Sequence, residues 1–328
     1  MKVGLLQFFG WRDRSIPLED VYKRALDRIE IMDRTGYDAV WLAEHHFSGY
    51  SVCPSVHLMA MHIASRTKRL RIGTAVTLAA FYHPLRVAEE VALLDVLTCG
   101  RINWGAGRGF DPIEMSVFGV DPKESTARFR EAVEIVLAAW TNERLTFEGE
   151  FHRYEDVEVL PKPFQRPHPP TWVAASSLGA IEWAASRGLS ILMDPHSAHA
   201  EIARKLGHYR SGLEESGHEF GRRDIPTARL VALAETDAEA AAIAIRGAKW
   251  TAGYVPKQAL TNFRSDDRTP TPVAHYMDDV IIHGSPERVL DTLRRLEEEI
   301  PLRYLLLSPL SEKTFELFTQ RVLPHLLD

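Results

Sequence analysis

The sequence predicts an α/β fold, a (β/α)8 barrel with insertions, as a single domain over residues 1–328. Eight short apolar runs alternate with segments of helical periodicity, the pattern of parallel strands joined by crossover helices. The chain has 328 residues and no linker, low-complexity tract or second compositional regime. A barrel takes ~250 residues before insertions. A doubly wound open sheet is the alternative, and it would need fewer strands or a visible domain break.

The predicted strands are short apolar runs that suit strands buried on both faces. They span residues 2–9, 38–43, 70–78, 101–105, 171–175, 189–193, 227–235 and 303–307. The predicted helices repeat apolar side chains at helical spacing, and several begin or end at Pro, Ser or Gly. They span residues 17–35, 55–66, 85–97, 124–140, 179–187, 198–215, 238–250, 285–298 and 312–327.

Two stretches break this rhythm and are read as insertions. Residues 144–170 alternate aromatic and polar side chains and then become rich in proline, which predicts a hairpin followed by a loop. Residues 251–283 are less regular and contain Thr-Pro-Thr-Pro at 269–272. That segment is predicted to be an exposed loop and a candidate lid.

Composition excludes several classes of function. The net charge is −6 and there is no basic block, which argues against nucleic acid as the main partner. No run approaches ~18 apolar residues, so no membrane span is expected. The apolar N-terminal run is too short for a signal peptide. Cys53 and Cys99 lack metal-ligand spacing, which favours a reducing compartment, and we expect a cytoplasmic protein.

The end of the second strand carries the strongest signal for chemistry, Glu44-His45-His46. Ionisable groups at the mouth of a buried strand are costly unless they are paired or used. Neighbouring side chains on a strand face opposite ways, so His45 and His46 cannot easily chelate one metal. One imidazole in the pocket is favoured, as a proton donor or acceptor with an ordinary pKa of ~6.5. Simple hydrogen bonding that closes the strand is the alternative.

Three further strand ends could hold a phosphate, another anion or a flat ring. Arg108 lies among glycines in residues 105–109, and a guanidinium there suits a phosphate, although a tight turn alone also explains the glycines. Ser176 and Ser177 begin a helix, where free N–H groups favour an anion, and simple capping is the alternative. The small side chains of residues 73–76 leave room for a flat ring, or pack in the core.

A metal site is a weaker hypothesis. His196 and His199 form a His-x-x-His pair close to Asp194, after the sixth strand. His199 is expected to face solvent in the first turn of its helix, so we assign no metal ligands.

These features together resemble the bacterial luciferase-like flavin monooxygenase family, from the first strand to the closing helix. The last third of the chain matches mainly in its pattern of elements. The residues that carry the resemblance are 36–47 (Gly-Tyr-Asp-Ala-Val-Trp-Leu-Ala-Glu-His-His-Phe), 73–75, 83–86, 93–95, 100–101, 107–109, 118–119 and 182–185.

The resemblance implies a barrel that typically dimerises through helices of its N-terminal half. It implies that reduced FMN arrives from a separate reductase and reacts with O2 to a C4a-peroxyflavin, which inserts one oxygen into an apolar organic substrate. His45 matches the catalytic histidine and His46 its neighbour, and Glu44 is assigned to the cofactor site. Ala75-Val76 matches a non-proline cis peptide beside the flavin ring. The matches to phosphate contacts are Arg108, Arg128, Val173, Ala175, Ser176, Ser177 and Gly179.

The chain also departs from luciferase itself. Ala106 and Ala175 stand where luciferase has a reactive cysteine and a flavin-binding glutamate, and the turn at 178–180 is one residue longer. These departures argue against light emission, not against flavin chemistry. The alternatives are a deazaflavin-dependent oxidoreductase on the same barrel, a flavin-binding barrel without turnover, and a zinc hydrolase.

Overall fold

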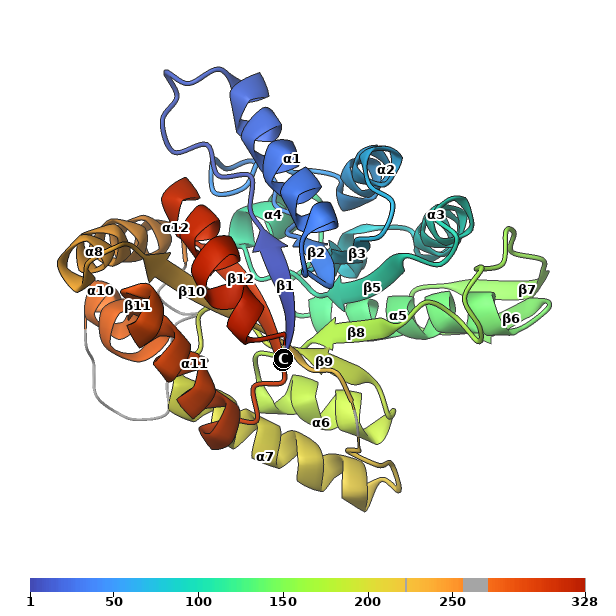
Figure 1. The fold of residues 1–328 in the computed structure, drawn as a ribbon. Helices are drawn as coiled ribbons and strands as arrows, with labels where there is room; N and C mark the ends of the chain where they lie inside the picture. Colours follow the sequence, from blue (N-terminus) through green and yellow to red (C-terminus); the bar gives the residue numbers. More distant parts are fainter. Residues whose placement is uncertain (222, 256–270, 328) are drawn as a thin grey trace. The chain divides into compact units, whose positions relative to one another are not determined.

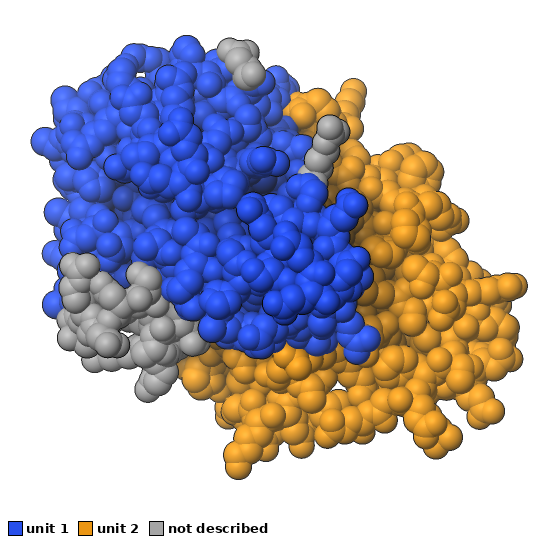
Figure 2. All heavy atoms as spheres, turned by 90° about the horizontal axis from the view of Figure 1, so that it is seen from below, with its two compact units in different colours: residues 1–6, 34–38, 173–328 blue, residues 7–33, 39–172 orange. Residues whose placement is uncertain are grey.

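The computed structural model describes residues 1–221, 223–255 and 271–327 (Figure 1). Its strands alternate with helices as predicted, and all eight predicted strands are present. The chain divides into two compact units, shown in different colours in Figure 2. Unit 1 comprises Met1–Leu6, Arg34–Asp38 and Val173–Asp328, and unit 2 comprises Gln7–Asp33 and Ala39–Trp172. Each unit is described by itself, and a single domain stays a prediction.

Unit 2 holds a parallel sheet in the order β2-β3-β5, with β4 paired to β5. Its strands are β2 (Ala39–Leu42), β3 (Arg71–Thr74), β4 (Thr77–Leu78) and β5 (Ile102–Gly107). Its helices are α1 (Leu18–Arg34), α2 (Val56–Arg66), η1 (Ala79–Phe81), α3 (Pro84–Leu97), α4 (Pro112–Val117) and α5 (Ser125–Thr141). Every residue of β2 is buried, and α1 buries the apolar stripe Ala25, Ile29 and Met32.

In unit 1, β10 pairs with β11 and β12, and β12 pairs with β1, all in parallel. Its strands are β1 (Lys2–Gln7), the end of β8 (Thr171–Ala174), β9 (Ser190–Leu192), β10 (Pro226–Leu233), β11 (Ile282–Gly284) and β12 (Tyr304–Pro309). Its helices are α6 (Leu178–Ser186), α7 (His199–Glu215), α8 (Asp237–Tyr254), α10 (Pro272–His275), α11 (Pro286–Glu299) and α12 (Glu312–Leu317). A bridge between Met193 and Thr227 joins the end of β9 to β10.

The structure corrects several predicted boundaries. The single strand predicted over residues 70–78 is two strands, β3 and β4, separated by Ala75 and Val76, whose peptide bond is cis. The closing helix is interrupted after α12 by the π-helix η4 (Phe318–Val322) and the 3-10 helix η5 (Leu323–His325). The predicted hairpin is confirmed as the antiparallel pair β6 (Leu145–Glu148) and β7 (Arg153–Val157).

Other regular segments lie in stretches that were read as irregular. Helix α4 is too short for a periodic signal, although Asp111 caps it and Pro112 opens it. The end of the 251–283 insertion is ordered as α10, the π-helix η3 (Tyr276–Val280) and β11, because Tyr276 and Val280 pack into an apolar cluster with β10 and α8. Residues 256–270, the middle of the predicted lid at 251–283, lie outside the described residues. Within the described residues, no helix has the length and apolarity to span a bilayer.

Candidate functional site

Glu44 lies just beyond β2, and its buried carboxylate interacts with three protein groups. Its side chain is 0% exposed, and its Oε1 lies 3.0 Å from Nε2 of His46. The same oxygen accepts the phenol O–H of Tyr82 at 2.7 Å, and Oε2 accepts the Leu78 N–H at 3.3 Å. Burial and the neighbouring Glu44 carboxylate both raise the pKa of Tyr82, so its proton stays on the phenol. Glu44 therefore orients His46 and would act on a ligand through it.

Glu114 is the carboxylate partner of the His45 ring, as Glu44 is of the His46 ring. Its Oε1 lies 3.3 Å from Nδ1 of His45 and accepts the backbone N–H of His46 at 2.9 Å. The Glu114 side chain is only 2% exposed. A carboxylate facing Nδ1 favours the proton on that nitrogen, which leaves Nε2 as the basic atom. Sequence reasoning missed Glu114 because it missed α4; the Asp111-Pro112 helix start was the available signal.

The two imidazoles lie in different surroundings, although β2 ends at Leu42 and strand alternation therefore does not explain the difference. The His45 ring contacts Phe8, Tyr50 and Phe110. The His46 ring contacts Phe47 and, edge to face, Phe118. Each histidine is therefore enclosed by aromatic rings on one side and fixed by its own buried carboxylate on the other.

His46 lines a hollow of about 590 Å³ in unit 2. The other lining residues are mostly apolar and come from α2, from α3, from the segments before these helices and from the residue after α4. They are Pro54, Ser55, His57, Leu58, Met61, Phe81, Tyr82, Glu90, Leu93, Leu94, Leu97 and Phe118. The volume is within the range of small-molecule pockets, roughly 300–1,000 Å³.

The cis peptide between Ala75 and Val76, expected from the resemblance, is present. Both residues are half-buried. The preceding Thr74 is tied to Gly105 of β5 by two hydrogen bonds, from its hydroxyl to the carbonyl oxygen at 2.7 Å and from the amide to its hydroxyl at 2.9 Å. A side chain at Gly105 would clash with the Thr74 carbonyl, so glycine is required for this close approach.

Arg108 follows β5 and has no acidic partner among the residues that the structure describes. Its guanidinium donates to the hydroxyl of Ser125, the first residue of α5, at 3.2 Å. Partial burial lowers its pKa, and no neighbouring carboxylate opposes that effect. A half-desolvated cation without a counter-charge, at the start of a helix, is suited to an added anion.

Arg128 lies one turn along α5 in a different setting. Its guanidinium pairs with Glu124 at 2.9 Å and stacks over the ring of Phe151 at 4.2 Å. It lines a smaller hollow of about 310 Å³ together with His83 and His152. Its assignment to the phosphate stays a prediction, with weaker support than that of Arg108.

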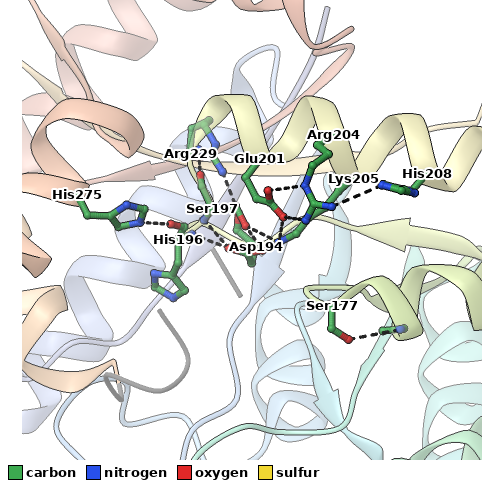
Figure 3. Close-up of polar contacts among 11 residues, drawn as sticks. Ser177, Asp194, His196, Ser197, Glu201, Arg204, Lys205, His208, Arg229 and His275 are labelled. Atoms are coloured by element: carbon green, nitrogen blue, oxygen red, sulfur yellow. Dashed lines mark hydrogen bonds and ion pairs between the residues drawn. The ribbon is translucent and has the colours of Figure 1, made fainter. Parts of the chain in front are cut away.

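In unit 1, the predicted phosphate turn follows β8. Val173 and Ala175 are buried, Ser176 is half-buried and Ser177 is exposed. The Ser177 hydroxyl caps α6 by accepting the Ala180 N–H, as Figure 3 shows. A Cβ added to Gly179 would meet no atom within 4 Å, so the start of this helix is open to a ligand.

The metal hypothesis finds no support in the described residues, where no three His, Cys, Asp or Glu side chains gather around a common point. The expectation that His199 faces solvent is wrong. Its Nδ1 is buried without a hydrogen-bond partner, and burial lowers the pKa of His199 to about 3. It stays neutral because the first turn of α7 packs this imidazole inward.

Comparison with known proteins gives consistent matches. A family model described as luciferase-like monooxygenase matches residues 1–301. The oxygenase component of flavin-dependent trigonelline monooxygenase from Acinetobacter baylyi is 30% identical over 295 residues, 85% of this chain and 81% of that protein. The uncharacterized protein y4wF of Sinorhizobium fredii is 41% identical over 170 residues, 52% of this chain and 50% of that relative's length.

The solved structure of monooxygenase RslO1 from Streptomyces bottropensis matches with a TM-score of 0.82 and 29% identity, over 99% of both chains. This likeness confirms the predicted fold class, a (β/α)8 barrel with insertions.

Proposed function

This chain belongs to the luciferase-like monooxygenase family, and we propose that it is a two-component FMN-dependent monooxygenase acting on an apolar organic substrate. The observation that carries the proposal is the pair of adjacent histidines at the end of β2, each bonded to its own buried carboxylate. Such pairs hold an imidazole in one tautomer and support its charge during proton transfer. The flavin-dependent relative supports the choice of cofactor.

One feature in each unit supports, taken by itself, the binding of a flavin phosphate. Arg108 lacks an acidic partner in the described chain, and the Ser176-Ser177 turn opens α6 with an exposed hydroxyl. We assign Ala75 and Val76 to the flavin ring, as the resemblance implies. Reduced FMN, when bound, supplies the electrons that activate O2.

The roles of this chain's own residues follow from the hydrogen bonds. Nδ1 of His45 faces Glu114, so His45 exchanges a proton at Nε2. His46 is held by Glu44, and it orients the substrate or its proton. The aromatic rings around both imidazoles exclude water from these atoms.

A separate reductase is proposed as the supplier of reduced FMN, because the trigonelline relative is named as the oxygenase component of its system. We also propose a cytoplasmic location, because Cys53 and Cys99 are free.

For assembly we propose a homodimer through α2 and α3. Leu58, Leu93 and Leu97 are exposed on these helices around the hollow, and contiguous exposed apolar side chains mark interfaces. Sedimentation of Leu58→Lys should show monomers if this face is the interface.

The deciding experiment is anaerobic titration of the purified chain with reduced FMN, reduced riboflavin and reduced deazaflavin, followed by O2. We expect tight binding of reduced FMN and O2 uptake. Arg108→Met should weaken FMN binding at least tenfold and leave riboflavin binding unchanged, because only FMN carries the phosphate. Arg144→Met, in the exposed hairpin, is the matched control. Binding of reduced deazaflavin without FMN binding or O2 uptake would replace the proposal with the oxidoreductase alternative.

A further inference from the structure

The strand β4 of unit 2 consists of only two residues, Thr77 and Leu78. It pairs in parallel with β5. Because so short a strand forms few backbone hydrogen bonds, its position depends on the side chains around it. Ala75 and Val76, which we assign to the flavin ring, come directly before it in the chain. The contacts that hold β4 therefore also hold the backbone at the proposed ring site.

Two side chains hold β4 through hydrogen bonds. Glu44 accepts the Leu78 N–H, as described above. The hydroxyl oxygen of Thr77 lies 3.2 Å from Nε2 of His57, which stands in the first turn of α2. Thr77 is 0% exposed, and the side chain of His57 is 8% exposed. The bond between His57 and Thr77 is therefore shielded from water.

A carboxylate of α3 meets the other nitrogen of the same ring. Nδ1 of His57 lies 2.8 Å from Oε2 of Glu90. Oε1 of Glu90 accepts a hydrogen bond from the guanidinium of Arg86 at 2.8 Å. The hydrogen bond with His57 lowers the pKa of Glu90, so this group is ionised at neutral pH. His57 thus connects α3 to β4.

The pairing with Glu90 decides which nitrogen of His57 carries the proton. An ionised carboxylate only accepts hydrogen bonds, so the proton sits on Nδ1. In the neutral ring Nε2 is then an acceptor, and the Thr77 hydroxyl donates to it. Both nitrogens of His57 are thus engaged within the protein. This arrangement suits a residue that positions a neighbour better than one that exchanges protons with a ligand.

A hydrogen bond at position 57 does something that an apolar contact would not do. Val56 and Ala60 are buried on the same helix, so an apolar side chain between them would also pack. Apolar burial has no preferred direction, whereas a hydrogen bond weakens steeply when its angle changes. The pair formed by His57 and Thr77 therefore fixes the orientation of β4 as well as its burial.

We propose that His57 is a positioning residue that, with its proton held by Glu90, fixes the Thr77 hydroxyl and so the backbone that meets the flavin ring. This inference rests on the proposed function for the identity of the ligand. A segment that is ordered before binding loses less conformational entropy when the ligand arrives. His57 therefore strengthens binding of the ring and has no effect on recognition of the phosphate.

The first test is anaerobic titration of the full chain with reduced FMN and reduced riboflavin. His57→Leu should weaken binding of both flavins by the same factor, roughly fivefold, as expected for one neutral hydrogen bond. Arg108→Met, in contrast, should weaken FMN binding alone. His62→Leu, at an exposed histidine of the same helix, is the control and should change neither affinity. Unchanged binding by His57→Leu, or a loss confined to FMN, overturns the proposal.

Two amide variants separate positioning from packing. The amide of His57→Gln reaches the place of Nε2 and can still accept the Thr77 hydroxyl. The amide of His57→Asn reaches only the place of Nδ1 and can still donate to Glu90. We expect His57→Gln to bind both flavins within about twofold of the wild type, and His57→Asn to bind as weakly as His57→Leu. Equal affinities for the two amide variants overturn the positioning role.

A double variant tests whether His57 acts through Thr77. Thr77→Val removes the hydroxyl with little change of shape and should also weaken both flavins roughly fivefold. Combined with His57→Leu it should cause no further loss, because both changes remove the same bond. Thr98→Val is the control, since this buried threonine donates to the Leu94 carbonyl oxygen at the end of α3. Additive losses in the double variant overturn the link through Thr77.

A readout without flavin separates this inference from the proposed function. Amide hydrogen exchange of residues 75–78 should be at least roughly threefold faster in His57→Leu than in the wild type, and unchanged in His62→Leu. Unchanged exchange in His57→Leu overturns the positioning role by itself. If the wild type binds neither flavin, the proposed function fails, and faster exchange would still establish that His57 fixes β4.

Discussion

The ends of β2 and β9 both present histidines, and the two regions hold them in opposite ways. After β2, the ring of His45 pairs with the buried carboxylate of Glu114, and the ring of His46 pairs with that of Glu44. After β9, the carboxylate of Asp194 and the guanidinium of Arg229 form hydrogen bonds with the backbone around His196, and the phenol oxygen of Tyr276 lies 3.0 Å from Nδ1 of its ring.

The difference bears on the chemistry each region can perform. A carboxylate beside an imidazole stabilises the imidazolium, so the β2 pair is suited to take up and release a proton. A phenol carries no negative charge at neutral pH, so Tyr276 gives the β9 histidine no comparable support. Variants that remove a ring, a cation or a carboxylate test this division.

His45→Ala should produce the largest effect on activity. Without the imidazole, proton transfer loses its acid or base, and we expect product formation to fall roughly 100-fold or more. Reduced-FMN binding should persist, because Arg108 and the α6 turn are untouched. Product yield and flavin affinity are measured on the same preparation. Oxygenation at the full rate would show that the β2 pair is structural.

Arg229→Met should produce the largest effect on stability. It removes the donor to three carbonyl oxygens, those of Ala228, Ser197 and Asp194, and leaves Asp194 with less compensating charge. We expect the free energy of unfolding to fall by about 3 kcal/mol, as for other broken buried ion pairs. Urea unfolding followed by circular dichroism gives the value, with the exposed Arg144→Met as the control. A change within the error of the control would mean that the turn does not depend on this cation.

Glu114→Gln should have an intermediate effect. The amide can still hydrogen-bond to His45, but it carries no charge to stabilise the imidazolium. We expect about a tenfold loss in the rate of product formation and little loss of stability. Glu148→Gln, in the exposed hairpin, is the matched control. A rate equal to that of the control would show that Glu114 serves only to hold the His46 backbone.

The sequence was most informative where one stretch forms a complete feature. The apolar runs that became β2 and β5 were predictable, because a strand and its end lie within about ten residues. The assignment of Arg108 to a phosphate stays a prediction. Glu114 was not predictable, since α4 is a six-residue helix and shows no periodicity.

The contact between His196 and Tyr276 was out of reach for a different reason. Their positions differ by 80 in the sequence, and no local pattern links a strand end to a distant π-helix. The prediction for His199 was wrong because the first turn of a surface helix is normally exposed to water. Here Nδ1 of His199, in the first turn of α7, is buried.

His199 also supplies a check on the β9 region, which is read from the pH dependence of stability. Burial, followed by the charges of Arg229 and Arg295, lowers its pKa to about 3 in the folded chain. The unfolded chain takes up a proton near pH 6.5, so this group's contribution to stability is complete above that pH and is lost as pH falls toward 3. The slope is about 1.4 kcal/mol per pH unit.

The free energy of unfolding of His199→Asn, measured between pH 7.5 and 4.5, should depend on pH less steeply than that of the wild type, by about one proton. His208→Asn, at an exposed histidine of α7, is the control. Identical slopes in the variant and the wild type would show that His199 is protonated in the folded chain, and that the β9 region is more open to water than its buried cations imply.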